Sequence, residues 1–199
     1  MQDFESVHLS SIRHMFNQPL AQAACAVCTQ NDLEPVFALR ERCFGEEKNY
    51  LLNLKQGGHP GEDDIDPHSI IYRMDLGPAC IGSARITSIE DYGLPHFSSF
   101  QAEDTAVFSR ICIEKEYRQQ NLHVLMFYEF SNWLLTHTAY RNYISLCTAP
   151  EYRLYHSLGA RRTAIGKFKL YPNQAENYIV VRGSISEFNQ MCQETLLIK

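Results

Sequence analysis

The chain has 199 residues, of which 45% are hydrophobic and 12% are aromatic, and this composition fits one domain with a sizeable core. The formal net charge of -5 at pH 7 argues against a protein that holds nucleic acid mainly by neutralising phosphates. No stretch approaches the roughly 18 apolar residues of a membrane helix, so we expect a soluble, cytoplasmic protein with no nucleic-acid partner.

The first thirty residues are predicted to form an N-terminal arm, and residues 31–199 the functional domain. Within the arm, residues 15–28 show weak helical periodicity. Cys25 and Cys28 have the spacing of a metal or redox motif, but no second such pair and no nearby histidine would complete a zinc site. The favoured interpretation is two small helix residues, and we expect no metal. The seven cysteines are an odd number in apolar segments, which is typical of reduced core residues rather than of a disulfide framework.

A helix is predicted over residues 33–44, because Asn31 and Asp32 can cap its start and Gly45 can end it. The following segment, residues 50–66, contains several glycines and an acidic run with little to pack. We expect this segment to be a mobile flap.

The rest of the chain alternates between predicted strands and helices. Strand-like runs at residues 69–75 and 80–87 predict a β-hairpin, and the apolar run 106–113 predicts a central strand covered on both faces. Residues 122–136 have the length and apolar face of a helix. The pattern then predicts a strand at 143–147, a short helix at 150–158 that ends at Gly159, and an antiparallel pair at 167–171 and 177–181.

The turn after the central strand is rich in hydrogen-bond donors, namely Arg118, Gln119, Gln120 and Asn121. The first turn of a helix attracts anions because free N–H groups and the positive end of the helix dipole point to the same place. The alternative interpretation is an ordinary exposed helix start.

This turn resembles the pyrophosphate-binding turn of GNAT-superfamily acyltransferases, which carries an Arg/Gln-x-x-Gly-x-Gly/Ala pattern. Here the matching positions run from Arg118 to His123. Asn121 can adopt a left-handed turn, whereas His123 places a bulky side chain where backbone would approach pyrophosphate. The resemblance implies an acyl-phosphopantetheine donor, and an acyl chain on acyl carrier protein would tolerate the lost glycines better than coenzyme A.

The segment from Arg153 to Ala160 resembles the Tyr-x-x-x-Gly-Phe element of the same superfamily. The tyrosine of that element faces the thioester, which implies that Tyr155 gives its proton to the departing thiolate. Tyrosine suits this role because its proton lies within reach of thiolate basicity. Taken alone, Tyr155 could equally be a packing residue.

Four segments resemble a narrower group, the acyl-homoserine-lactone synthases with the related N-acyl amino acid synthases and exosortase-associated acyltransferases. The group has an early helix with arginine and phenylalanine, an acidic flap, a Gly-Ser/Thr-x-Arg-Leu strand end and a Glu-x-Ser-Arg strand. The matching residues, in order, are Arg40 with Phe44, Glu62 to Ser69, Gly82 to Ile86, and Phe108 to Ile111.

The resemblance implies an α/β (α+β) GNAT fold, with a mixed central sheet of about six to seven strands flanked by helices. It also implies that Arg85 and Arg110 pair with Asp63 or Asp66 of the flap, since an unpaired buried charge is costly. The implied substrate-site residues are Arg40, Asp63, Asp66, Arg85, Ser109 and Arg110. The alternative role for these residues is an ion-pair network that only fixes the flap.

The implied reaction is the transfer of a fatty acyl group from acyl carrier protein or acyl-coenzyme A to the amino group of a small metabolite such as an amino acid. A backbone N–H near Cys112 or Ile113 would bind the carbonyl oxygen, which makes these two residues part of the implied donor site. No metal is required.

One departure is Val107, which stands where the group has glutamate. This argues against homoserine-lactone synthesis from S-adenosylmethionine and requires another base, because an ammonium must lose a proton before it attacks. Glu114 is the chosen candidate, with Glu90 and Glu103 as others. Two further functions stay open: a generic acetyl-coenzyme-A-dependent N-acetyltransferase and a catalytically silent GNAT-shaped binding module.

Overall fold

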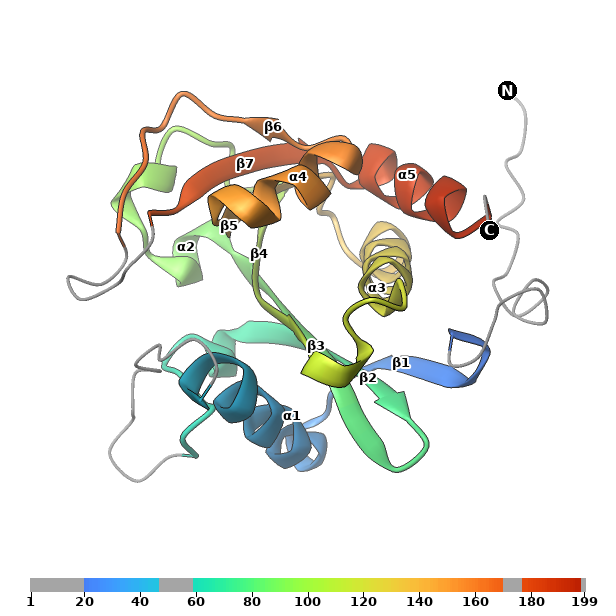
Figure 1. The fold of residues 1–199 in the computed structure, drawn as a ribbon. Helices are drawn as coiled ribbons and strands as arrows, with labels where there is room; N and C mark the ends of the chain where they lie inside the picture. Colours follow the sequence, from blue (N-terminus) through green and yellow to red (C-terminus); the bar gives the residue numbers. More distant parts are fainter. Residues whose placement is uncertain (1–19, 47–58, 170–176, 198–199) are drawn as a thin grey trace.

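The computed structural model describes residues 20–46, 59–169 and 177–197, and these residues build one open sheet with helices on both faces (Figure 1). The strand order is β1-β2-β3-β4-β5-β7-β6, and among the strands of these described ranges only β4 and β5 pair in parallel. The strands are β1 (Ala23–Val27), β2 (Ser69–Leu76), β3 (Ala79–Ser88), β4 (Thr105–Ile113), β5 (Asn142–Cys147), β6 (Arg161–Arg162) and β7 (Ile179–Ser184). The helices are α1 (Leu33–Arg40), α2 (Ile89–Tyr92), α3 (Leu122–His137), α4 (Ala149–Ser157) and α5 (Ile185–Leu197). The predicted fold class, a mixed sheet flanked by helices, is confirmed.

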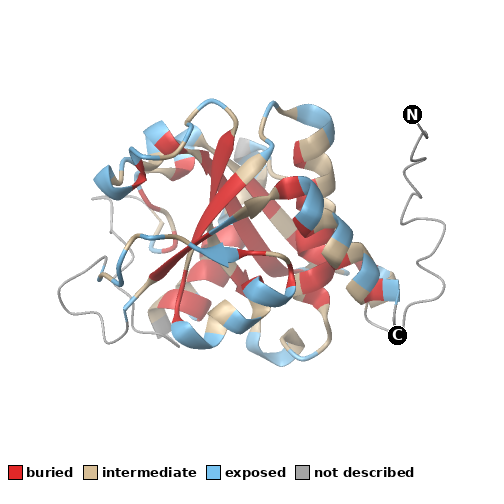
Figure 2. Ribbon diagram, turned by 90° about the horizontal axis from the view of Figure 1, so that it is seen from above, coloured by how far each residue is buried: buried red, intermediate tan, exposed pale blue. Residues whose placement is uncertain are grey.

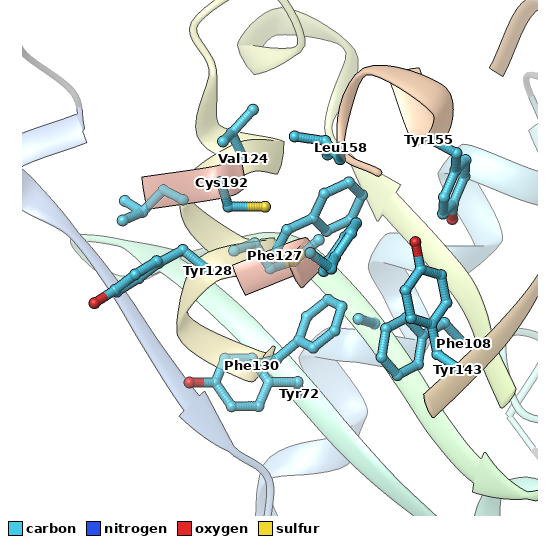
Figure 3. Close-up of a cluster of buried hydrophobic side chains, with 14 of the residues drawn as sticks. Tyr72, Phe108, Val124, Phe127, Tyr128, Phe130, Tyr143, Tyr155, Leu158 and Cys192 are labelled. Atoms are coloured by element: carbon cyan, nitrogen blue, oxygen red, sulfur yellow. The ribbon is translucent and has the colours of Figure 1, made fainter. Parts of the chain in front are cut away.

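Two helical layers cover the sheet. Helices α3 and α5 pack against each other on one face, where Phe108 of β4 contacts Phe130 of α3 and Phe188 of α5. Phe127 belongs to the same buried cluster (Figure 3). Helix α1 packs on β3 at the other face, and α2 packs beside it on β3 and β4. The central strands are therefore buried while the outer helix faces remain exposed (Figure 2). This double cover explains why the sequence of β4 is almost continuously apolar.

Local signals in the sequence account for most element boundaries. The hairpin β2–β3 turns at Gly77 and Pro78, and Gly77 has the positive φ of 59° that such a tight turn requires. Helix α4 begins with a capping box between Thr148 and Glu151 and is followed by Gly159 at φ 88°. The predicted helix at 33–44 is present as α1, but the chain continues as a π turn over Glu41–Glu46, so Gly45 lies inside the last turn.

The predicted helix at residues 15–28 is wrong where the structure describes it. Residues 23–27 form edge strand β1, which pairs antiparallel with β2 so that Cys25 lies opposite Met74. Burial alternates along β1, with Ala23 fully buried and Ala24 exposed, so the period is that of a strand. The hydrogen bonds that these residues form with the edge of β2 outweigh their weak and short helical pattern.

Two further predictions fall partly outside the described residues. Of the predicted flap, residues 50–58 lie outside them, and residues 59–66 are described. The predicted C-terminal pair is present as an antiparallel bridge between Phe168 and Tyr178, and residues 170–176 lie outside the described part. Helices α2 and α5 and the short strand β6 were not predicted. None of the helices in the described ranges is both long enough and apolar enough to cross a bilayer.

Strands β4 and β5 diverge halfway along their length. Their parallel pairing ends at Phe108 opposite Ser145, although β4 continues to Ile113 and β5 to Cys147. On its other side β4 bulges, because the register with β3 shifts between the Ser83–Cys112 and Arg85–Ser109 pairs. Arg110 in this bulge has φ 50°, a left-handed conformation that is uncommon outside glycine. The split and the bulge together open the sheet at its centre.

Candidate active site

A cavity of about 570 Å³ occupies the split between β4 and β5. Its wall includes β4 from Ser109 to Ile113 and receives side chains from both helical layers. Phe44 and Tyr92 line it from the layer of α1 and α2 together with Arg85 of β3, and Arg118, His123, Phe127 and Tyr155 line it from the side of α3 and α4. The cavity therefore reaches through the sheet and not only into one face of it.

An ion-pair network lies on the side of α1. Asp66 accepts a hydrogen bond from Arg40 at 2.8 Å and lies 3.3 Å from Arg85. Asp63 pairs with Arg85 and accepts from Arg110 at 2.8 Å. Arg40, Asp63, Asp66 and Arg85 are buried, whereas Arg110 is partly exposed to the cavity. The two aspartates thereby fasten the flap to α1, β3 and β4 at once.

The geometry around Asp63 explains why it stays ionised. Burial alone would raise its pKa, but the charges of Arg85 and Arg110 outweigh burial and hold the pKa below the ordinary value. The backbone N–H of Ile65 also donates to its carboxylate at 3.0 Å. Ser109 joins the network because Arg85 Nε donates to its hydroxyl at 3.0 Å. The structure thus brings all six implied substrate-site residues together.

Tyr155 enters the cavity from α4. Its hydroxyl is hydrogen-bonded to that of Ser145 at 3.1 Å, and Ser145 donates to the Phe108 carbonyl at 2.9 Å. Burial raises the pKa of Tyr155 well above its usual value, and the Ser145 hydrogen bond offsets only part of this rise. Tyr155 therefore keeps its proton at neutral pH, as a proton donor must.

The expected donor turn is only partly at the cavity. Arg118 and His123 line it, and Arg118 Nε donates to the carbonyl of Ile113 at 2.8 Å. Asn121 has the left-handed conformation expected of it, at φ 57°, and directly precedes α3. Gln119 and Gln120 lie in the turn but not on the cavity wall, and the Gln120 amide donates to the Glu116 carbonyl. Cys112 and Ile113 line the cavity beside the bulge.

The candidate bases lie away from the cavity. Glu114 accepts two hydrogen bonds from Arg42, at 2.6 and 2.9 Å, and does not line the cavity. Glu90 and Glu103 are exposed and also lie off the cavity wall. This arrangement disfavours Glu114 as the base. Val107 is fully buried in an apolar cluster with Ile89, Phe97, Ile144 and Val180, so no carboxylate replaces the missing glutamate there.

Sequence reasoning missed several residues at the cavity. Asp64 lines it with an exposed side chain, and Ser145 holds the Tyr155 hydroxyl. The acidic run could have pointed to Asp64, since neighbouring carboxylates on a flap face different ways. Nothing in the sequence could have paired Ser145 with Tyr155, because that contact depends on how α4 packs on β5. Among the described residues no cluster of three or more histidine, cysteine or acidic side chains is arranged to hold a metal ion.

No protein-family model matches this chain, and no curated protein matches it. Solved structures do resemble it. One is the coenzyme-A-dependent acyl-homoserine lactone synthase BjaI with SAM and isopentyl-CoA, at TM-score 0.70 and 16% identity over 87% of this chain and 89% of that one. A second is FeeM, an N-acyl amino acid synthase from uncultured soil microbes, at TM-score 0.60 and 14% identity over 85% and 94%. A third is a putative N-acetyltransferase from Lactobacillus plantarum, at TM-score 0.60 and 17% identity over 82% and 98%.

These similarities are structural, because the identities are far below the level at which sequence alone would relate the chains. They show that the chain has the fold shared by GNAT acetyltransferases, acyl-homoserine lactone synthases and an N-acyl amino acid synthase. The predicted resemblance is thereby confirmed at the level of the fold.

Proposed function

We propose that this chain, which has the GNAT fold, is an N-acyltransferase that moves an acyl group from a phosphopantetheine thioester to the amino group of a small metabolite. The observation that carries the proposal is the cavity through the split sheet. Tyr155 reaches it from one helical layer, and the network of Asp63, Arg85 and Arg110 reaches it from the other. A thioester and an amine that enter from the two sides would meet at the bulge of β4.

The acyl donor belongs on the side of α3 and α4. Arg118 and His123 stand where the phosphopantetheine arm would pass, and apolar side chains such as Leu146 and Leu154 continue the wall. These side chains suit a fatty acyl group better than an acetyl group. The donor is acyl carrier protein or acyl-coenzyme A, and the resemblance to a structure with bound isopentyl-CoA supports a coenzyme-A-type donor as one of these two.

The reaction follows from the groups on the wall. A backbone N–H near Cys112 or Ile113, beside the bulge, binds the thioester carbonyl oxygen, and one such donor is worth about 3 kcal/mol in the transition state. The amine attacks the carbonyl carbon, the C–S bond breaks, and Tyr155 protonates the departing thiolate. Asp64 replaces Glu114 as the candidate base, because it is the exposed carboxylate of the flap that faces the cavity.

The acceptor is an amine other than S-adenosylmethionine. Val107 removes the carboxylate that the acyl-homoserine lactone synthases place at this position, and apolar neighbours surround it. Arg110, which is partly exposed and lines the cavity, is the guanidinium that would contact the carboxylate of an acceptor such as an amino acid.

Mass spectrometry tests this proposal directly. Purified protein is incubated with thioesters of acyl carrier protein and of coenzyme A, from acetyl to hexadecanoyl, and with pooled amino metabolites. A long-chain N-acyl amino acid is the expected product. Exclusive acetylation would instead indicate a generic N-acetyltransferase, and thioester binding without product or free thiol would indicate a binding module.

A further inference from the structure

The cavity has an apolar wall on the face of the sheet that α2 covers. Tyr92 is the last residue of α2, Leu94 follows it after Gly93, and Tyr178 directly precedes β7. All three side chains line the cavity and are partly exposed. The reaction outlined above assigns no role to this wall.

Packing places the three side chains over one apolar floor. Tyr92 and Leu94 pack against a buried apolar cluster. Tyr178 faces the same way, because it lies opposite Phe168 in the antiparallel bridge and Phe168 packs against that cluster too. The buried members of the cluster are Ile89, Phe97, Val107, Ile144 and Val180. The wall is therefore supported by apolar side chains only.

The ring of Tyr92 is held in position by two neighbours. It stacks on Phe97, which is fully buried, with 5.7 Å between the ring centroids. The guanidinium carbon of Arg85 lies 5.8 Å from the centroid of the same ring, a distance at which a cation is attracted to an aromatic face. A ring fixed in this way needs little ordering when a ligand packs against it.

Arg85 also connects this wall to the polar part of the cavity. Its Nε donates to the hydroxyl of Ser109 at 3.0 Å, and Ser109 precedes Arg110 on the cavity wall. From Arg110 to Tyr92 the wall thus changes from cationic to apolar. An α-amino acid with an apolar side chain has the same order of groups, since its carboxylate and amine are next to that side chain.

We propose that Tyr92, Leu94 and Tyr178 form the subsite for the side chain of the acceptor, which is an amino acid with an apolar side chain such as leucine or phenylalanine. The proposal rests on the proposed function, because it names the acceptor of that transfer. The acyl chain has a wall of its own on the side of α3 and α4, where Phe127 and Leu154 line the cavity. Glycine would leave the apolar wall in contact with water, and a charged side chain would lose hydration against it.

Equilibrium binding tests the subsite without turnover. Calorimetry measures the affinity of the full chain for leucine, phenylalanine, glycine, aspartate and lysine, with and without a non-reactive thioester analogue. We expect leucine and phenylalanine to bind about 10-fold to 100-fold more tightly than glycine, because burial of their side chains removes apolar surface from water. Equal affinities, tighter binding of glycine, aspartate or lysine, or no binding of any amino acid would overturn the proposal.

Binding and turnover together separate this proposal from the proposed function. If leucine binds with the expected preference but neither amide nor free thiol forms, the apolar subsite is supported and acyl transfer is not. If amides form with the same kcat/KM from all the amino acids, acyl transfer is supported and the subsite is overturned.

Leu94→Ala tests the wall itself. We expect the ratio of kcat/KM for leucine to kcat/KM for glycine to fall roughly 10-fold, because the substitution removes apolar contact with the longer side chain only. Both values come from one preparation, so the ratio does not depend on how much of the variant is folded. Ile165→Ala is the matched control, because Ile165 packs against the same cluster but does not line the cavity, and its ratio should equal that of the unaltered chain.

Two results with these variants would overturn the proposal. An equal fall of the ratio in Ile165→Ala would show a general loss of packing rather than a lost contact with the acceptor. The second is an altered preference of Leu94→Ala between octanoyl and hexadecanoyl thioesters with an unchanged leucine-to-glycine ratio, which would assign the wall to the acyl chain.

Discussion

The hydroxyl groups of Tyr155 and Ser145 lie 3.1 Å apart at the last position where β4 and β5 still pair. Ser145 is also bonded to the carbonyl of Phe108, its partner in that pairing. The proposed proton donor is therefore fixed to the apex of the split rather than to a loop. A thioester that enters the split would meet the Tyr155 hydroxyl where the pairing of β4 and β5 ends.

Replacing Tyr155 with phenylalanine should slow turnover without weakening donor binding. General-acid groups typically contribute about 10²–10⁴-fold to rate, and the ring itself would stay in place. Steady-state release of free thiol gives kcat, and calorimetry with a non-reactive thioester analogue gives the donor affinity. An unchanged kcat would assign Tyr155 to packing alone.

Tyr143→Phe is the matched control for this substitution. The Tyr143 hydroxyl is buried, has no hydrogen-bond partner among the described residues, and does not line the cavity. We expect turnover close to that of the unaltered chain, and a melting temperature that is equal or higher, because a buried hydroxyl without a partner costs free energy. A rate loss like that of Tyr155→Phe would show that the two tyrosines act together.

Asp63 should make stability depend on pH in the acidic range. Its pKa in the folded protein is below the ordinary value of 3.8, so its contribution to the unfolding free energy is complete above pH 3.8 and is lost as the pH falls through and below that value. Asp63→Asn leaves two guanidinium groups without this carboxylate and should cost about 3–5 kcal/mol at neutral pH. Urea unfolding from pH 7 to pH 3 measures both effects.

Asp64→Asn serves as the control for stability, since Asp64 is the exposed neighbour of Asp63. Its unfolding free energy should follow that of the unaltered chain at every pH. A curve for Asp63→Asn that is parallel to the unaltered curve throughout would show that Asp63 does not titrate as its ion pairs require.

Glu114→Gln should change turnover little, whereas Asp64→Asn should lower it. Glu114 is held by Arg42 outside the cavity wall, and Asp64 lies on that wall. The expected loss for Asp64→Asn lies in kcat and should be largest at low pH, where more of the amine is protonated and needs a base. The pH profiles of kcat and of kcat/KM for both variants measure this, and the reverse ranking would restore Glu114 as the base.

Gly61→Ala should detach the described part of the flap from α1. A Cβ atom at Gly61 would overlap the backbone carbonyl of Phe37, which no side-chain rotation can relieve. The cost should be about 1–3 kcal/mol of unfolding free energy and a higher acceptor KM, because Asp63 lies two residues further on. Gly166→Ala is the control, since no atom lies within 4 Å of its Cβ position.

Much of the fold was predictable because its signals are local. A pattern of a few neighbouring residues is enough to predict each of three features: the strands β2 to β5 from their apolar runs, the start of α4 from its cap, and the hairpin turn from Gly77. Strand β1 was not predictable in this way, because five residues of small side chains adopt a strand only when β2 offers its edge.

The same distinction between local sequence signals and long-range packing holds for the candidate site. Arg40, Asp63, Asp66, Arg85 and Arg110 could be named from motif order, and the structure brings them together. The sequence could not reveal that Arg42 would bind Glu114, nor that Cys43 Sγ would lie 3.7 Å from the carbonyl oxygen of Ile113. Those contacts arise from the packing of α1 against β3 and β4, and side-chain packing between distant segments leaves no periodic trace in the sequence.

The cavity reaches both faces of the sheet, and this bears on the order in which substrates bind. Neither substrate would need to leave before the other arrives, so both would occupy the protein as a ternary complex. Double-reciprocal plots would then intersect rather than run parallel, and an inert thioester would compete with the donor but not with the amine. A protein built in this way would protect its thioester from water only while the second entrance is filled, so hydrolysis without an acceptor would reveal how well that entrance closes.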